Sequence, residues 1–203
     1  MPLFFCAQRR KFIVRCEHSA GEAVSIFEEK CDEAVRFIID YVGGIRREND
    51  MFEAVNYRSL TGNNKGIYIF AVSEDLKLST SELERFNRPK KIKRGKHKGR
   101  DASMPRLTSQ ILRQGDLFYI GSKVSGSLQA RISQHYDAEL SSVSALRLNL
   151  PQREFVGRVL TVYTFLLKND LGASPITEYC IIKTVEGKLH REKGALSGSG
   201  RLN

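Results

Sequence analysis

Two three-residue strings, Gly66-Ile67-Tyr68 and Tyr119-Ile120-Gly121, lie in short apolar stretches of this 203-residue chain. β-Branched and aromatic residues favour strands, so the sequence predicts strands over residues 66–72 and 117–122. If these strands pair antiparallel, the hydroxyls of Tyr68 and Tyr119 come close enough to order a water molecule. The glycine of each string lets another backbone or a ligand approach closely. Either string alone is more typical of an ordinary core strand, and only their combination indicates a site.

A helix is predicted over residues 126–136, and it carries Arg131 and His135 four residues apart on one face. Arginine can hold a phosphate oxygen and stabilise developing charge, and histidine can position or accept a proton. Lys123 could lower the pKa of a neighbouring tyrosine through its positive charge. A solvated helix face is the alternative interpretation. The fixed offset from Tyr119 favours the site.

A second helix is predicted to start at Ser174 and Pro175 and to carry Glu178. Phosphoryl chemistry needs a hard cation, and Mg²⁺ is often held by one or two carboxylates and water. Glu178 is therefore the candidate metal ligand, although acids also favour helix N-termini through the macrodipole. Glu186 on the same helix is a weaker candidate. Asn203, the last residue, could donate to a phosphate or be a frayed end.

Taken in this order, the motifs resemble those of the GIY-YIG nuclease superfamily over about residues 62–203. The resemblance implies a small α/β (α+β) core, in which a three-stranded antiparallel sheet is flanked by helices, and hydrolysis at one metal ion. It also implies a role for each motif residue: Tyr68 as the general base or its immediate partner, Tyr119 ordering the water, Arg131 holding the scissile phosphate, His135 assisting the base, Glu178 binding Mg²⁺ or Mn²⁺, and Asn203 steadying the phosphate, with Ser197 or Ser199 as alternatives to Asn203.

The positive charge of the chain is concentrated in one segment. Of the net charge of +10, eight charges lie between residues 88 and 100, and removing them leaves 10 − 8 = +2. Such a segment favours a polyanion partner through counterion release, and a solvated basic loop is the alternative. It belongs to a predicted polar insertion over about residues 73–115 with a short helix near 80–86. We expect residues 88–115 to follow a DNA groove. The predicted contact residues are Arg88, Lys90, Lys91, Lys93, Arg94, Lys96, Lys98 and Arg100.

Residues 1–61 are predicted to form an N-terminal extension to a nuclease core over residues 62–203. The extension should contain a strand or hairpin within residues 3–16 and a helix that starts with a capping box at Ser19 and Glu22. Apolar residues at helical spacing continue to Val42, and Gly43-Gly44 predicts the end of that helix. Farther along the chain, an apolar run predicts a long strand over residues 155–167.

The predicted function is a sequence-specific, divalent-metal-dependent endonuclease of double-stranded DNA, similar to the type II restriction enzymes of the superfamily. Cutting both strands of a palindrome needs two active sites, so a homodimer on DNA is expected. Two alternatives remain open. One is a structure-specific repair, recombination or homing nuclease with the same core, and the other is a basic DNA-binding domain without catalytic activity. We expect no membrane span and no signal peptide, and four scattered cysteines favour a reducing cytoplasm. The resemblance to restriction enzymes implies that this is a prokaryotic cytoplasm.

Overall fold

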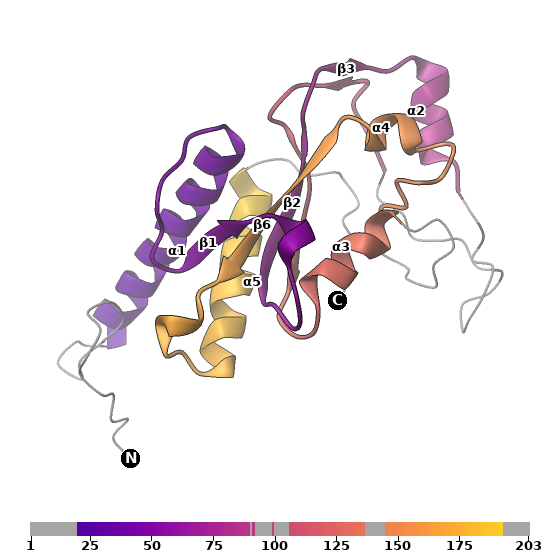
Figure 1. The fold of residues 1–203 in the computed structure, drawn as a ribbon. Coiled ribbons are helices and arrows are strands. Elements are labelled where there is room, and N and C mark those ends of the chain that lie inside the picture. The colour runs from indigo at the N-terminus through magenta and orange to yellow at the C-terminus, as the bar shows by residue number, and fades with distance from the viewer. Residues whose placement is uncertain (1–19, 90, 92–98, 100–105, 137–144, 193–203) are drawn as a thin grey trace.

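The central feature of the computed structural model is a four-stranded antiparallel sheet in the order β1-β6-β2-β5 (Figure 1). The structure describes residues 20–89, 91, 99, 106–136 and 145–192. The strands are β1 (Phe52–Val55), β2 (Gly66–Val72), β5 (Leu117–Lys123) and β6 (Leu160–Leu167). The expectation of a mixed α/β fold with an antiparallel sheet is confirmed. The described sheet has four strands instead of three because β1, from the predicted extension, pairs with β6.

Helices cover both faces of this sheet. Ile67, Ile69 and Ala71 of β2 are buried on one face against α1 (Ala20–Val42) and α5 (Pro175–Glu192), which we call the α1/α5 face. The alternate residues of β2 are buried on the opposite face, called the α3 face after α3 (Leu128–Tyr136). Because successive side chains of a strand point to opposite faces, one strand supplies both layers.

Helix α1 follows from its apolar periodicity. Cys31, Val35, Ile38 and Val42 are buried, at the spacing that places them on one side of a helix. Val24, in its first turns, is 62% exposed and takes no part in the core. The helix ends at Val42, before the predicted glycine pair. The strand or hairpin predicted for residues 3–16 and the Ser19 cap lie outside the described residues.

The insertion after β2 contains folded elements of its own. Strands β3 (Leu76–Lys77) and β4 (Ile111–Leu112) pair antiparallel, and the predicted short helix is present as α2 (Thr80–Asn87). Ser79 and Glu82 form a capping box at its start. Four apolar side chains of the insertion are buried in the α3-face cluster: Leu78, Phe86, Leu107 and Leu112. The described part of the insertion is therefore packed on the domain.

The strand predicted over residues 155–167 is wrong in its first part. Residues Glu154–Gly157 form the short helix α4, and β6 begins at Leu160. The helix is anchored by Val156, which is fully buried, and by Arg153, whose Nη1 donates to the Leu146 carbonyl at 2.8 Å. An apolar run cannot by its composition be divided between buried helix and buried strand. Two 3₁₀ turns complete the described elements, η1 (Tyr57–Ser59) and η2 (Asn169–Leu171).

Among the described residues, the helices are too short or too polar to span a lipid bilayer.

Candidate active site

Strand pairing brings the two glycine strings together. Tyr68 of β2 stands opposite Gly121 of β5 in the antiparallel register. The Tyr68 ring lies over this glycine, because a Cβ at position 121 would come within 2.4 Å of its Cζ and Oη atoms. A Cβ at Gly66 would lie 2.1 Å from the Phe165 carbonyl oxygen of β6. Both glycines therefore permit close approaches that a larger residue would block.

Three polar rings meet in the buried layer of the α3 face. The ring centroids of Tyr68 and Tyr119 are 6.1 Å apart, and that of His135 is 5.4 Å from Tyr68 and 4.8 Å from Tyr119. Exposure is 1% for Tyr68, 8% for Tyr119 and 0% for His135. Residues from β2, β5 and α3 that are far apart in sequence thus form one cluster, and Tyr119 lies nearest to solvent.

Hydrogen bonds assign the tautomer of His135. The backbone N–H of Leu146 donates to His135 Nδ1 at 3.0 Å, so Nδ1 is the unprotonated nitrogen. The neutral ring then carries its proton on Nε2, which lies 2.8 Å from the Tyr68 hydroxyl oxygen. His135 therefore donates to Tyr68, and the hydroxyl proton of Tyr68 points away from the imidazole.

The charge state of His135 agrees with this assignment. Burial, together with the positive charge of Arg131, lowers the pKa of His135 to about 3. The imidazole is neutral at physiological pH and its free lone pair is occupied by Leu146. At this pH His135 can orient Tyr68 by donating to its hydroxyl, but it has no free lone pair to accept a proton. Of the two roles predicted from the sequence, positioning fits this geometry and accepting a proton does not.

The two phenols differ in how readily they lose a proton. Burial raises the pKa of Tyr68 well above its ordinary value, and the charge of Tyr119 raises it further. Burial also raises the pKa of Tyr119, and the lowering by Arg131 and by the neighbouring Tyr68 hydroxyl offsets this rise only in part. Since Tyr68 is the more deeply buried ring and its pKa is raised well above the ordinary value, Tyr119 is the phenol that ionises more readily.

Arg131 is the cation of this cluster. It is half-buried on α3, one turn before His135, and its Nη1 donates to Gln134 Oε1 at 2.9 Å. Its charge lowers the pKa of Tyr68, of Tyr119 and of His135. Lys123 ends β5, opposite Gly66, and its Cε would be 3.5 Å from a Cβ at Gly126. The largest causes of the shifts in the pKa of the two tyrosines are burial, their mutual contact, Arg131 and, for Tyr119, Glu186.

Two carboxylates of α5 lie partly buried near the ends of β2 and β5. Ser174 Oγ accepts from the Thr177 N–H at 3.2 Å and starts the helix as predicted. Glu178 forms an ion pair with Lys65, the residue directly before Gly66. Glu186, two turns later, accepts from Ser122 Oγ at 2.8 Å and pairs with Lys183 at 2.7 Å. The charge of Glu186 raises the pKa of Tyr119.

The described residues contain no group of three or more His, Cys, Asp or Glu side chains that could hold a metal ion. Glu178 and Glu186 nevertheless offer carboxylate oxygens, and their side chains are 19% and 16% exposed. A hard cation held by one carboxylate and several waters fits this chemistry. In both cases a lysine ammonium now neutralises the carboxylate, so the metal ion would replace the lysine as its partner.

Comparisons with protein-family models, with curated proteins and with solved structures found no match.

Several predicted site residues lie outside the described part of the chain. They are Asn203, Ser197 and Ser199 at the end, and Lys90, Lys93, Arg94, Lys96, Lys98 and Arg100 in the basic segment. Arg88 and Lys91 are described, and both are exposed.

Two features of the site have only weak signals in the sequence. Leu146, which fixes the tautomer of His135, acts through its backbone, so its side chain carries no information about this role. Glu186 was predicted only as the weaker carboxylate, although it is the one coupled to Tyr119. In the sequence, Glu186 lies eight residues after Glu178 and close to the apolar residues Ile182 and Val185, which are buried in the structure. This spacing is the sequence feature that could have indicated a partly buried carboxylate.

Proposed function

We propose that this chain is a sequence-specific, divalent-metal-dependent endonuclease of double-stranded DNA, with a site of the GIY-YIG kind and restriction-type cleavage. The observation that carries the proposal is the convergence of Tyr68, Tyr119 and His135 in one layer, with Arg131 acting on all three. A core that needed only packing would not require three polar rings and a guanidinium at one place.

In this proposal Arg131 holds the scissile phosphate. A half-buried guanidinium binds two phosphate oxygens through parallel N–H donors and stabilises the charge that grows on them in the transition state. Gln134, which accepts from Arg131 Nη1, keeps the guanidinium in place from within the same helix. The phosphate then lies beside the hydroxyl of Tyr119, the more exposed of the two phenols.

Tyr119 in its phenolate form takes the proton of the attacking water. The water oxygen forms a bond to phosphorus as the bond between phosphorus and the leaving sugar oxygen breaks, and the leaving oxygen takes up a proton from solvent water. In this step the Tyr68 hydroxyl would donate to the Tyr119 phenolate and stabilise it, while His135, 2.8 Å from the Tyr68 hydroxyl, holds Tyr68 in place. Tyr119 is therefore proposed as the base and Tyr68 as its immediate partner, in preference to the reverse order.

The proposed metal ligand is Glu178, with Glu186 as the competing carboxylate. A bound Mg²⁺ or Mn²⁺ ion would supply Lewis acidity at the phosphate oxygens. Lys65 would be released from Glu178 when the ion binds, and its ammonium would be free for the DNA backbone. We propose a homodimer on DNA, in which each copy cuts one strand. The exposed residues Arg88 and Lys91 are proposed DNA contacts.

The test is cleavage of plasmid DNA by the pure protein with Mg²⁺, repeated with Tyr119→Phe, Tyr68→Phe, Glu178→Ala and Glu186→Ala. Tyr179→Phe on the exposed side of α5 is the matched control. Discrete fragments that disappear with Tyr119→Phe and with one of the two carboxylate variants support the proposal. Cutting confined to branched DNA would indicate a structure-specific nuclease instead. Binding without cutting would indicate a non-catalytic DNA-binding domain, and neither binding nor cutting would refute all of these functions.

A further inference from the structure

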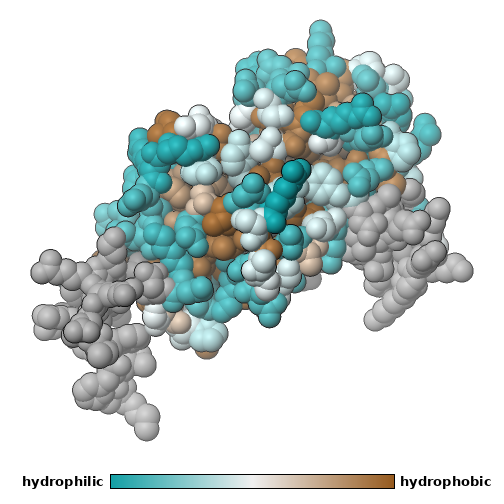
Figure 2. Space-filling view, viewed as in Figure 1, coloured by the Kyte–Doolittle hydropathy of each residue, from teal (hydrophilic) through white to brown (hydrophobic). Residues whose placement is uncertain are grey.

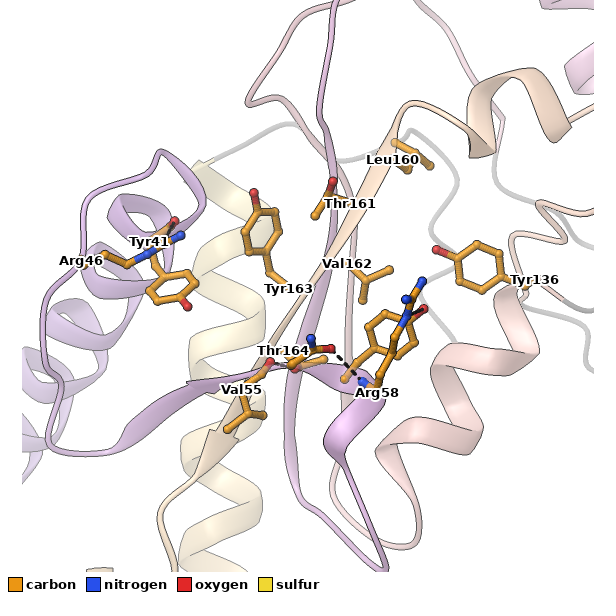
Figure 3. Close-up of a pocket in the computed structure, with 12 residues that line it drawn as sticks. Tyr41, Arg46, Val55, Arg58, Tyr136, Leu160, Thr161, Val162, Tyr163 and Thr164 are labelled. Atoms are coloured by element: carbon orange, nitrogen blue, oxygen red, sulfur yellow. Dashed lines mark hydrogen bonds between the residues drawn. The ribbon is translucent and has the colours of Figure 1, made fainter.

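A groove of about 440 Å³ lies where β6 extends beyond its partner β1 (Figure 3). The pairing of β1 with β6 ends at Val55 and Thr164. Residues 160–163 of β6 continue along β2 on one side, and within the described residues no strand pairs with their other edge. Figure 2 shows apolar surface in the middle of this face, bordered by hydrophilic side chains. The open edge of β6 therefore lines the groove together with residues of α1, η1 and α3.

The lining of this groove has an unusual composition. Four tyrosines and two arginines contribute to it, and its lining residues include no acid. The aromatic and charged members are Tyr41, Tyr57, Tyr136, Tyr163, Arg46 and Arg58. All four tyrosines are half-buried, so part of each remains accessible from the groove. Aromatic rings interleaved with cations in this way bind planar bases and their phosphates.

The two arginines stand on opposite sides of the groove, each with a tyrosine (Figure 3). The guanidinium of Arg46 lies 3.8 Å from the centroid of the Tyr41 ring. That of Arg58 lies 5.8 Å from the centroid of Tyr57, and its Nε donates to the Tyr57 hydroxyl at 3.4 Å. These contacts position positive charge beside aromatic rings at both walls.

The groove shares a wall with the candidate active site. Tyr136 lines the groove and directly follows His135 on α3. Phe70 lies between them, with ring centroids 5.8 Å from Tyr136 and 5.3 Å from His135. The pKa of Tyr136 is raised to about 12, mainly by burial. Tyr57 also raises this pKa and Arg58 lowers it, so both side chains lie close to Tyr136. The Phe70 ring thus packs against both a residue of the groove and a residue of the candidate site.

We propose that this groove binds an unstacked nucleotide of a single DNA strand, with its base against the tyrosine rings and its phosphate at Arg58. The inference deepens the proposed function and rests on it for the identity of the strand. A peptide added as a strand to the open edge of β6 is the competing use. Such a peptide is held mainly by main-chain hydrogen bonds and would not need four phenols, two guanidiniums and the absence of acids.

The experiment measures binding of two fluorescein-labelled oligonucleotides of about 12 nucleotides by anisotropy, in EDTA. One is a single strand of thymidines, and the other is an abasic strand with the same phosphates. The variants are Tyr57→Leu, Tyr57→Phe and Arg58→Ala, with Tyr179→Leu and Arg36→Ala as matched controls outside the groove. Circular dichroism and the midpoint of thermal unfolding establish that each variant is folded.

We expect the wild-type protein to bind the thymidine strand about tenfold more tightly than the abasic strand, because a base stacked on an aromatic ring adds that much affinity. Tyr57→Leu should lose most of this difference and Tyr57→Phe should keep it. Arg58→Ala should weaken binding of both strands, and the controls should bind as the wild type does.

Equal affinity for the two strands, or groove variants that bind as the wild type does, would overturn the inference and leave strand addition as the use of the β6 edge. Because the assay contains no divalent metal and scores no cleavage, it separates this inference from the proposed nuclease. A protein that shows the base-dependent binding but never cuts DNA would refute the proposed function alone.

Discussion

The two faces of the central sheet are equally buried but differ in chemistry. On the α1/α5 face, Ile67 and Ile69 lie in a cluster of apolar side chains and are fully buried. On the α3 face, the alternate residue Tyr68 meets Tyr119 and His135 in an equally buried layer. The period of two along β2 therefore places a residue of the core directly beside a residue of the candidate site.

This difference separates stability from chemistry. An apolar layer stabilises the domain through burial and close packing, whereas a buried polar cluster needs hydrogen bonds to avoid a desolvation penalty. The α3 face meets that need with Leu146 N–H, His135 and the two phenols. Substitutions on the α1/α5 face should mainly change the free energy of unfolding at every pH, and those on the α3 face should mainly change activity and the pH dependence of activity and of stability.

The largest expected effect is a loss of stability when the pH is lowered, and it comes from His135 on the α3 face. The pKa of His135 is about 3 in the folded protein, against an ordinary value of 6.5. Its contribution to stability is therefore present above pH 6.5 and is lost as the pH falls towards 3, by up to about 5 kcal/mol. Urea unfolding of wild type and His135→Gln over this pH range measures the difference. His190→Gln is the control, because burial also lowers the pKa of His190. An equally steep loss in His135→Gln would contradict the assignment.

The next largest effect compares neighbours on β2. Ile69→Ala opens a cavity in the α1/α5 face and should lower the free energy of unfolding by about 2–5 kcal/mol. Tyr68→Phe removes one hydroxyl and should lower it by about 1 kcal/mol. The order of the two variants should reverse for DNA cleavage, with Tyr68→Phe the slower. Denaturant unfolding and cleavage rates of both variants test this. If the same variant had the larger effect on both stability and cleavage, the two faces would not differ in their contributions to stability and to activity.

A smaller effect is expected at Gly121. A methyl group there would overlap the end of the Tyr68 ring, which must turn away, and such overpacking costs about 1–3 kcal/mol. Gly121→Ala should therefore lower stability moderately and disrupt the contact between Tyr68 and His135. A change in the imidazole resonances of His135 in nuclear magnetic resonance spectra would report the lost contact. Spectra identical to those of the wild type would mean that the ring does not rest on this glycine.

The smallest effect concerns the exposed cations. Arg88→Ser combined with Lys91→Ser should weaken DNA binding at every sequence, because each of these side chains neutralises one phosphate. The slope of log K against log salt should fall by about 2, since each phosphate neutralised by a side chain accounts for about 0.9 of that slope. Binding measured at several salt concentrations tests this, with the exposed Arg36→Ser as the control. An unchanged slope would mean that these two residues do not contact DNA.

The sequence predicted the elements whose signals are local. β2 and β5 follow from β-branched and aromatic runs, and α5 follows from Ser174 and Pro175 at its start. The run over residues 155–167 was wrongly predicted as one strand, because burial of Val156 in a helix and of Leu160 in a strand leaves the same apolar pattern. The addition of β1 to the sheet depends on a long-range pairing that local patterns do not contain.

The side chains of the candidate site could be predicted from the sequence, but their hydrogen bonds could not. Tyr68, Tyr119 and His135 carry motif spacing and come together in the structure. The tautomer of His135 could not be predicted, because it depends on a backbone N–H from another segment. The same is true of Glu186, whose link to Tyr119 depends on the packing of α5 beside β5.

The central claim is that Arg131 and the phenols beside it hydrolyse DNA. The most direct test is the initial rate of plasmid cleavage with Mg²⁺ by the wild type, by Arg131→Ala and by Arg158→Ala, an exposed arginine on the short α4 side of the molecule. We expect Arg131→Ala to cut about 10²–10³-fold more slowly at an unchanged fold, and Arg158→Ala to cut at the wild-type rate. Cleavage by Arg131→Ala at the wild-type rate would contradict the account.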